Sequence, residues 1–282
     1  MAMKTTLTTS PIQHQVSRHT SLLGVMLLRL IYLMYYALLY PPYYFWNKRD
    51  FKKQTKKNPF YVSKLVRLVE KHPRLYELSM FVLNFPRPTA VYHFLPELQG
   101  RVLQVGCGTG LLNKHAKGWR HAEFFNLDIN EKYLQFGMKK GRLHNCIHSG
   151  IYQVDKADES FDKIVFARCF HHIRHHKKAF KECARLLNKG GELWILDPVI
   201  LEEQGSGKQM SAGYMANSSI DGVIWRFTKQ AFIEHVLASL PGELELISIT
   251  ENRQPHLTNY NLKYPQTDIL AVIRKRNEGE NK

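Results

Sequence analysis

The chain has 282 residues and a formal net charge of +16. That length suits one sizeable α/β domain with an appendage better than two ordinary domains. Four cysteines without a C-x-x-C pair argue against a disulfide framework or a zinc site. Residues 1–60 contain nine Lys/Arg and a single acid, Asp50, so half of the charge excess lies there. Such an excess suits binding to nucleic acid or to an anionic membrane equally well. The neighbouring residues have to distinguish between these two possible partners.

Residues 22–40 read LLGVMLLRLIYLMYYALLY and end at Pro41-Pro42. The run is about as long as a helix needs to be to cross a bilayer, and its one charge is Arg29. Arg29 and three tyrosines recur at helical spacing, so a helix that lies in the membrane interface is equally possible. A buried core helix is the third reading.

Four aromatic residues, 43–46, follow this run, and residues 48–57 then carry six Lys/Arg. Aromatic residues favour the headgroup region, and positive charge stays on the cytoplasmic side. We therefore predict that residues 22–57 associate with a membrane and that the rest of the chain lies on its cytoplasmic face. Interleaved basic and aromatic residues around a cleft would be expected for nucleic acid, so nucleic acid is not an expected partner.

Two amphipathic stretches, 60–73 and 74–85, predict helices that lead into the main domain. They either cover one edge of a sheet or shape the mouth of a substrate site.

The stretch VLQVGCGTG, residues 102–110, predicts a buried parallel strand, a glycine turn and a helix. Glycines allow backbone N–H groups to approach a ligand closely. The sixth place of a dinucleotide fingerprint needs Gly or Ala and is Leu111 here. A second strand ends at Asp128, where a carboxylate can accept both hydroxyls of a ribose.

With these residues, the chain from about 96 to 276 resembles the class I S-adenosylmethionine-dependent methyltransferases. The resemblance implies that the turn supports the methionine part of S-adenosylmethionine, the cofactor, and that Asp128 binds its ribose. The cofactor-binding residues that it implies are Gln104, Gly106, Cys107, Gly108, Gly110, Asp128, Ile129, Gly150, Ile151 and Arg168.

Two positions depart from the family pattern. Gln104 stands where the family usually has Asp, so the site lacks a negative charge for the cofactor's ammonium group. Gly150 stands where the family often has an acid before the residue that meets the adenine. We expect the backbone and Asp128 to retain binding, with the N–H of Ile151 facing the adenine.

The resemblance implies a Rossmann-like, doubly wound α/β fold. Its seven-stranded sheet is mostly parallel with an antiparallel last strand, and an N-terminal hydrophobic helix precedes it. Further strands are expected in FDKIVFA, ELWILDP, ELELISIT and TDILAVIRKR, with helices in KKAFKECARLL and TKQAFIEHVLASL. The domains expected are a membrane-associating segment, 1–58, a helical lead-in, 59–95, and a methyltransferase domain, 96–282.

The run FHHIRHH places His171 and His172 at the exit of a strand, beside the predicted cofactor. A neutral imidazole there can take a proton from a phenol, enol or amine, and a structural role is the alternative. His175 and His176 are expected at a solvated helix start. The four-residue spacing His171/His175 and His172/His176 would suit a metal, but no cysteine or carboxylate partner is placed nearby, so no metal is expected.

Residues 199–227 predict an insertion over the substrate, and a flexible surface loop is the alternative. Asp197, Tyr214 and Trp225 are the candidate substrate residues.

Three functions remain open. The first is methyl transfer at a membrane to an amphiphile such as a quinone precursor, a phospholipid headgroup or another lipid-like phenol. The second is methyl transfer to a soluble metabolite. The third is a cofactor-binding scaffold without activity, which Gln104 and Gly150 keep open.

Overall fold

The computed structural model describes residues 40–83, 91–117, 120–200, 213–252 and 266–277, together with Leu30, Met34, Ala37 and Leu38. The chain divides into two compact units, Met1–Tyr40 and Pro41–Lys282. The predicted apolar helix over 22–40 lies largely outside the described residues, although the five described positions within it are helical. Within the described ranges, no helix combines the length and the apolar character that crossing a membrane requires.

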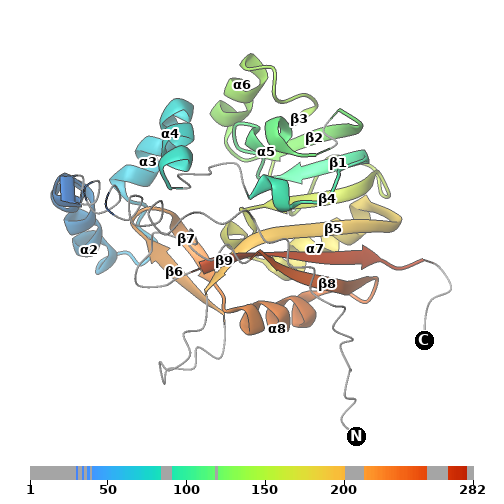
Figure 1. Ribbon diagram of the computed structural model, residues 1–282. Coiled ribbons are helices and arrows are strands. Elements are labelled where there is room, and N and C mark those ends of the chain that lie inside the picture. The colour runs from blue at the N-terminus through green and yellow to red at the C-terminus, as the bar shows by residue number, and fades with distance from the viewer. Residues whose placement is uncertain are drawn as a thin grey trace, which may run out of the picture. The chain divides into compact units, whose positions relative to one another are not determined.

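The second unit is built on a seven-stranded sheet with strand order β3-β2-β1-β4-β5-β9-β8 (Figure 1). The strands are β1 Gly100–Val105, β2 Ala122–Asp128, β3 Cys146–His148, β4 Phe161–Ala167, β5 Leu187–Ile200, β8 Leu244–Asn252 and β9 Gln266–Lys275. Strands β1 to β5 pair in parallel, whereas β9 is antiparallel to both β5 and β8. The predicted Rossmann-like sheet with an antiparallel last strand is confirmed.

Successive side chains of the strands point to opposite faces of this sheet, and helices cover both faces. Leu103 and Val105 of β1 pack with helices α7 His176–Leu186 and α8 Lys229–Ser239 in the larger core. Val102 points to the other face, where it packs with α5 Leu111–His115 and the short helix η2 Tyr92–Phe94. Helix α6 Glu131–Lys139 inserts Leu134 beside Cys107 under the glycine turn. Both faces are apolar because helices cover both, as in other parallel sheets.

A two-stranded hairpin, β6 Tyr214–Ser218 and β7 Gly222–Arg226, follows the fifth strand and was not predicted from the sequence. The segment before the lead-in helices binds its turn: Asn47 Nδ2 and Ser63 Oγ both donate to the carbonyl of Ser219, at 2.9 and 2.8 Å. The N-terminal elements are η1 Tyr44–Lys48, α2 Arg49–Thr55, α3 Lys64–Lys71 and α4 Pro73–Leu83. Figure 1 shows α2 and α3 beside β6 and β7. The predicted helices over 60–73 and 74–85 correspond to α3 and α4.

Candidate active site

The glycine turn joins β1 to α5 at the carboxyl end of β1, which lies between β2 and β4. Gly106, Gly108 and Gly110 have φ values of +62°, +55° and +80°. Residues with a side chain rarely adopt this left-handed region, so the backbone itself requires glycine here. Asp128, at the end of β2, accepts hydrogen bonds from the N–H groups of Gly108 and Asn130, both at 2.8 Å. The carboxylate therefore fixes the turn and keeps lone pairs for a further donor.

Burial raises the pKa of Asp128, against the hydrogen bonds from the backbone N–H groups, which lower it. The side chain is 8% exposed. A buried carboxylate gains from any additional hydrogen-bond donor that a ligand brings, such as a pair of hydroxyl groups.

Helix α4 lies over the turn. Contact between α4 and the turn was not predicted from the sequence for any particular residue. A Cβ placed on Gly108 would lie 3.1 Å from the hydroxyl of Tyr76. The Tyr76 ring packs on Tyr133, with 4.6 Å between ring centroids. The next residue, Glu77, accepts a hydrogen bond from Thr109 Oγ1 at 2.9 Å and pairs with Arg142. Helix α4 thus contacts the glycine turn, and the predicted role of the lead-in helices at the mouth of a substrate site stays a prediction.

Gln104 lies on β1 and is 2% exposed, and its Oε1 atom has no hydrogen-bond partner among the described residues. An acceptor buried without a partner costs free energy, so a donor group of a ligand would stabilise it. Ile129, directly after Asp128, is 76% exposed and offers an apolar surface for a flat ring. Cys107 is buried in the turn, where its N–H donates to Leu127. The unpartnered Gln104 acceptor and the exposed Ile129 are compatible with S-adenosylmethionine, and the contacts of Gln104, Cys107 and Ile129 with it stay predictions.

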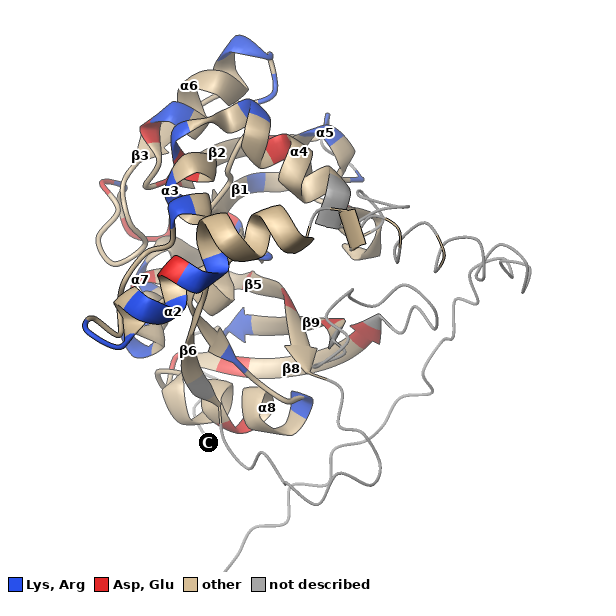
Figure 2. Cartoon of the chain, turned by 90° about the vertical axis from the view of Figure 1, so that its left-hand side faces the viewer, with Lys and Arg blue, Asp and Glu red and all other residues tan. Residues whose placement is uncertain are grey.

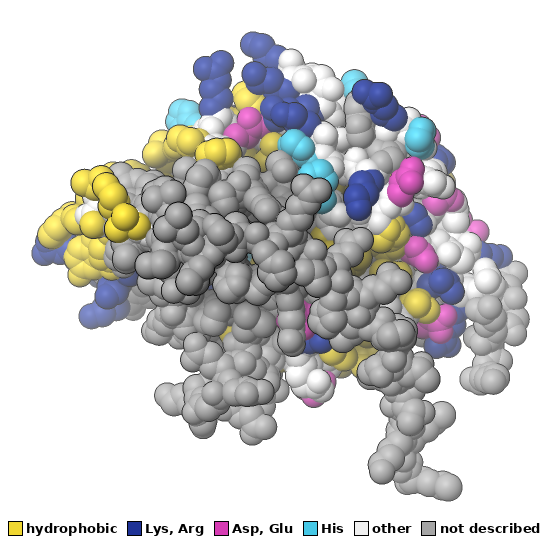
Figure 3. Space-filling model, viewed as in Figure 1, with side chains coloured by type: hydrophobic (Ala, Val, Ile, Leu, Met, Phe, Trp, Pro, Cys, Tyr) yellow, Lys and Arg dark blue, Asp and Glu magenta, His cyan; other side chains and the backbone are white. Residues whose placement is uncertain are grey.

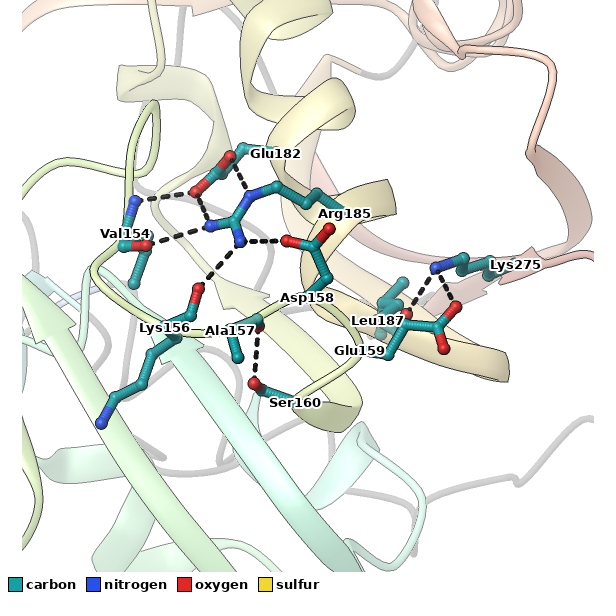
Figure 4. A network of polar contacts seen from close by, with 10 residues as sticks. All are labelled: Val154, Lys156, Ala157, Asp158, Glu159, Ser160, Glu182, Arg185, Leu187 and Lys275. Carbon is teal, nitrogen blue, oxygen red and sulfur yellow. Dashed lines mark hydrogen bonds and ion pairs between the residues drawn. The ribbon is translucent and has the colours of Figure 1, made fainter.

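The loop that carries Gly150 and Ile151 is held in place by Arg185 of α7 (Figure 4). The guanidinium donates to both carboxylate oxygens of Glu182, at 2.7 and 3.0 Å, and to the carbonyls of Val154 and Lys156, at 3.0 and 2.8 Å. Glu182 in turn accepts from the N–H of Val154 at 2.7 Å. Ile151 is buried, and a Cβ on Gly150 would be 3.9 Å from Ile129. Gly150 thus lies next to Ile129, and Arg185 fixes the later part of the loop at Val154 and Lys156. The contact of Ile151 with adenine stays a prediction.

Arg168 follows β4 with a φ of +59°, unusual for a residue with a side chain. Its guanidinium binds Asp268 of β9, with Nη2 2.7 Å and Nε 3.2 Å from the same carboxylate oxygen. The structure thus gives Arg168 a partner within the chain, and its predicted contact with the cofactor stays a prediction.

His171 lies on the short helix η3 Phe170–His172 and binds Asp197 of β5. The N–H of His171 and its Nδ1 atom both contact the carboxylate, at 3.0 Å and 2.9 Å. The strand register pairs Val105 with Phe166 and Ala167 with Leu196, so the glycine turn, η3 and Asp197 share one edge of the sheet. Ligands of open α/β sheets bind at this edge.

The electrostatics of the two histidines differ. Burial alone would lower the pKa of His171, but the charge and hydrogen bonds of Asp197 together outweigh it, so the pKa is raised. The pKa of His172 is lowered by loss of hydration around its ring and by the neighbouring charge of His171. Asp221, in the turn between β6 and β7, completes the group: its carboxylate oxygens lie 3.6 Å from His172 Nε2 and 3.9 Å from His171 Nε2.

The remaining histidines of the motif do not join this group. Helix α7 begins at His176, as expected, but the prediction that this start is solvated is wrong for His176. That side chain is 3% exposed because it stacks on Phe170, with ring centroids 4.1 Å apart, and its Nδ1 lies 2.7 Å from His235 Nε2.

Of the predicted substrate residues, Asp197 lies in the site. Trp225 of β7 stacks on Phe227, with ring centroids 5.6 Å apart, and packs against His176 and His235. The side chain of Tyr214 lies outside the described residues, as does the insertion over 201–212. Substrate contacts of Tyr214 and Trp225 remain predictions.

Comparison with known proteins agrees with this geometry. Residues 103–195 match a family model described as a methyltransferase domain. The chain is 28% identical over 136 residues to a demethylmenaquinone methyltransferase of Thermotoga maritima, covering 46% of this chain and 58% of that protein. It is 34% identical over 105 residues to a ubiquinone biosynthesis O-methyltransferase of Idiomarina loihiensis, covering 34% of this chain and 41% of that protein. The chain thus spans about half the length of these curated relatives.

Among solved structures, the chain resembles the 1,6-didemethyltoxoflavin-N1-methyltransferase of Burkholderia thailandensis, which holds 1,6-didemethyltoxoflavin and S-adenosylhomocysteine. The TM-score is 0.53 at 14% identity, over 75% of this chain and 86% of that chain. At this identity the similarity establishes the fold. The chain therefore has the class I methyltransferase fold, with a central region that matches the methyltransferase-domain family.

Proposed function

We propose that the chain is an S-adenosylmethionine-dependent methyltransferase that acts at a membrane surface on an amphiphilic acceptor. One observation carries the enzymatic part: a glycine turn held by Asp128 and a histidine held by Asp197 meet at the same edge of the sheet. The first arrangement suits S-adenosylmethionine, and the second suits an acceptor that has to lose a proton.

The protein's contribution to the transfer is mainly alignment. S-adenosylmethionine supplies a methyl group on a sulfonium, which is already a good leaving group. The Gly106–Gly110 turn and Asp128 would hold the cofactor, and Tyr76 and Glu77 of α4 contact this turn. His171 keeps the proton of Nδ1 toward Asp197 and can use Nε2 to assist deprotonation of the acceptor.

The N-terminal elements of the second unit support the membrane part. Phe45 and Trp46 of η1 are 67% and 45% exposed. The adjoining helix α2 carries Lys and Arg along its surface (Figure 2). Figure 3 shows hydrophobic side chains together with Lys and Arg where η1 and α2 lie. Exposed aromatic residues beside clustered positive charge favour an anionic lipid surface.

The type of acceptor is also a proposal. Two similar proteins bear names that refer to quinones, demethylmenaquinone and ubiquinone. A quinone precursor combines an ionisable hydroxyl with an apolar tail, and a membrane-bound enzyme meets such a lipid at a raised effective concentration. This supports a lipid-like phenol as the acceptor.

The experiment is transfer of labelled methyl groups from S-adenosylmethionine into a total lipid extract in anionic liposomes. We expect label in an organic-soluble product, and we expect the Phe45→Ser/Trp46→Ser variant to lose most of that transfer. The matched control is Leu237→Ser, which removes a 55% exposed apolar side chain from α8, far along the chain from η1. Point variants are preferable to truncation because Asn47 and Ser63 bind the β6–β7 turn.

Equal transfer by both variants, without a gain from liposomes, would contradict the membrane part and move the search to soluble acceptors. Tight binding of S-adenosylmethionine without transfer to any extract would favour the inactive scaffold.

A further inference from the structure

The structure brings three potential metal ligands together at the acceptor side of the site. One donor atom each of His171, His172 and Asp221 lies within 4.8 Å of the other two. The two histidines come from η3, whereas Asp221 comes from the β6–β7 turn, about fifty residues later in the chain. The carboxylate partner that the local sequence does not offer is thus supplied by the unpredicted hairpin.

The outer contacts of His171 and Asp221 orient both ligands. Asp197, 1% exposed, holds Nδ1 of His171, which leaves Nε2 directed toward Asp221. A carboxylate that binds the far nitrogen of a metal-ligating histidine is the usual support of such sites, because it fixes both tautomer and ring direction. The N–H of Asp221 donates to Ser218 Oγ at 3.3 Å, which holds the turn that carries the third ligand.

The spacing of these atoms suits a bridging cation better than direct pairing. The distances from Asp221 to the two Nε2 atoms, 3.6 and 3.9 Å, are too long for hydrogen bonds. Ligands at about 2.1 Å from a tetrahedral cation lie roughly 3.4 Å apart. Movements of a few tenths of an ångström would close these two distances around an ion, and the donor atoms of the two histidines lie within 4.8 Å of each other. A direct ion pair here would contribute little, since His172 and Asp221 are 42% and 47% exposed.

We propose that His171, His172 and Asp221 bind one divalent transition-metal cation, with zinc as the best fit, and leave a coordination position open for an oxygen of the acceptor. Two imidazoles with one carboxylate and an open position form a known type of reactive metal site. The proposal rests on the proposed methyltransferase function and specifies its acceptor: a phenol or enol whose hydroxyl binds the cation.

The cation gives Asp197 and His171 a defined part in the reaction. Coordination lowers the pKa of a bound hydroxyl, as it does for bound water. The O–H bond of the acceptor breaks and its proton passes to solvent. An oxygen lone pair forms the new bond to the methyl carbon, while the electron pair of the broken sulfur–carbon bond stays on sulfur. With the cation bound, Nε2 of His171 is a ligand and no longer assists deprotonation directly, and Asp197 acts as a positioning residue.

The test is titration of Co²⁺ into the full-length chain after treatment with EDTA, followed through the visible absorption of the bound ion. We expect one equivalent to bind in a low-symmetry site of nitrogen and oxygen ligands, and Zn²⁺ to displace it. Asp221→Asn and His172→Gln should weaken Co²⁺ binding by at least tenfold. Asp197→Asn, which changes no ligand, should weaken it about 10- to 100-fold.

His175→Ala is the matched control, because His175 is exposed and lies outside the cluster. Its Co²⁺ affinity should equal that of the wild type. His235→Gln controls for the separate His176–His235 pair. Asp221 is 47% exposed, so the Asp221→Asn variant should keep its fold, which circular dichroism and thermal unfolding will check.

Absence of a bound Co²⁺ spectrum, or a spectrum that Asp221→Asn and His172→Gln leave unchanged, would overturn the metal site. Failure of the proposed function is distinguishable, because binding of S-adenosylmethionine is measured separately by calorimetry in EDTA. Cofactor binding and methyl transfer that persist in EDTA and in Asp221→Asn would retain the methyltransferase and refute the cation. Co²⁺ binding by a chain that binds no S-adenosylmethionine would retain the metal site and refute the methyltransferase function.

Discussion

The contact between helix α4 and the glycine turn can be tested by substituting Gly108 with alanine. The change has two costs. The first is backbone strain, because Gly108 has a φ of +55°, which costs an alanine about 1–2 kcal/mol. The second is steric, because the new Cβ would lie 3.1 Å from the Tyr76 hydroxyl and 3.4 Å from its ring, so the ring has to move. Overpacking of this kind costs about 1–3 kcal/mol.

Gly141→Ala is the matched control for strain alone. Gly141 has a φ of +66°, and a Cβ there would meet nothing within 4 Å. Backbone strain should lower the free energy of unfolding of both variants. Only Gly108→Ala should lose further stability through the steric contact and bind S-adenosylmethionine more weakly. Urea unfolding measures the stabilities, and calorimetry measures the affinities.

The background variant Tyr76→Phe isolates the contact itself. Without the hydroxyl, the penalty of Gly108→Ala should fall, while the penalty of Gly141→Ala should stay the same. Equal free energies of unfolding for Gly108→Ala and Gly141→Ala, with no change in cofactor affinity, would refute the position of α4 over the turn.

Three further predictions concern other parts of the unit. Arg185→Lys keeps the charge but loses most of the hydrogen bonds to Glu182 and the loop carbonyls. We therefore expect a free energy of unfolding about 2 kcal/mol lower and a melting temperature lower by roughly 4–8 °C. An unchanged melting temperature would contradict the stabilising role of these hydrogen bonds. Burial lowers the pKa of His176 to about 4. Between pH 6.5 and pH 4 the unfolded chain therefore binds more protons than the folded chain, so the free energy of unfolding falls by up to about 3 kcal/mol as the pH decreases through this window. His176→Gln should flatten that part of the stability curve in urea unfolding, and an identical curve would show that His176 titrates normally. Asp128→Asn replaces one acceptor oxygen by a donor and removes the charge, so calorimetry should show S-adenosylmethionine affinity reduced by more than about tenfold, and unchanged affinity would remove Asp128 from the site.

The sheet could be predicted from the sequence because its strands have local signatures. The β1 strand is an apolar run that ends in the glycine turn, and β2 ends in Asp128. Each signal lies directly at the end of its own strand, and burial on both faces requires such apolar runs. The same holds for α7, whose apolar spacing follows directly after the histidine motif.

The β6–β7 hairpin was missed because its strands are only five residues each and lack a regular alternation of apolar and polar residues. A signal was present, since Asp221-Gly222 is a common turn dipeptide and Gly222 has a φ of +77°. The approach of Asp221 to His171 and of Tyr76 to Gly108 could not be predicted. Both depend on how distant segments pack, and no local pattern records that packing.

The central claim is that the glycine turn and Asp128 hold S-adenosylmethionine while the site transfers its methyl group. The most direct test is transfer from S-adenosylmethionine labelled in the methyl group, with a total lipid extract and a soluble extract as acceptors, by the full-length chain and by Asp128→Asn. The account predicts labelled product from the wild type and a large loss in the variant. No labelled product from either extract, or equal labelling by both proteins, would contradict it.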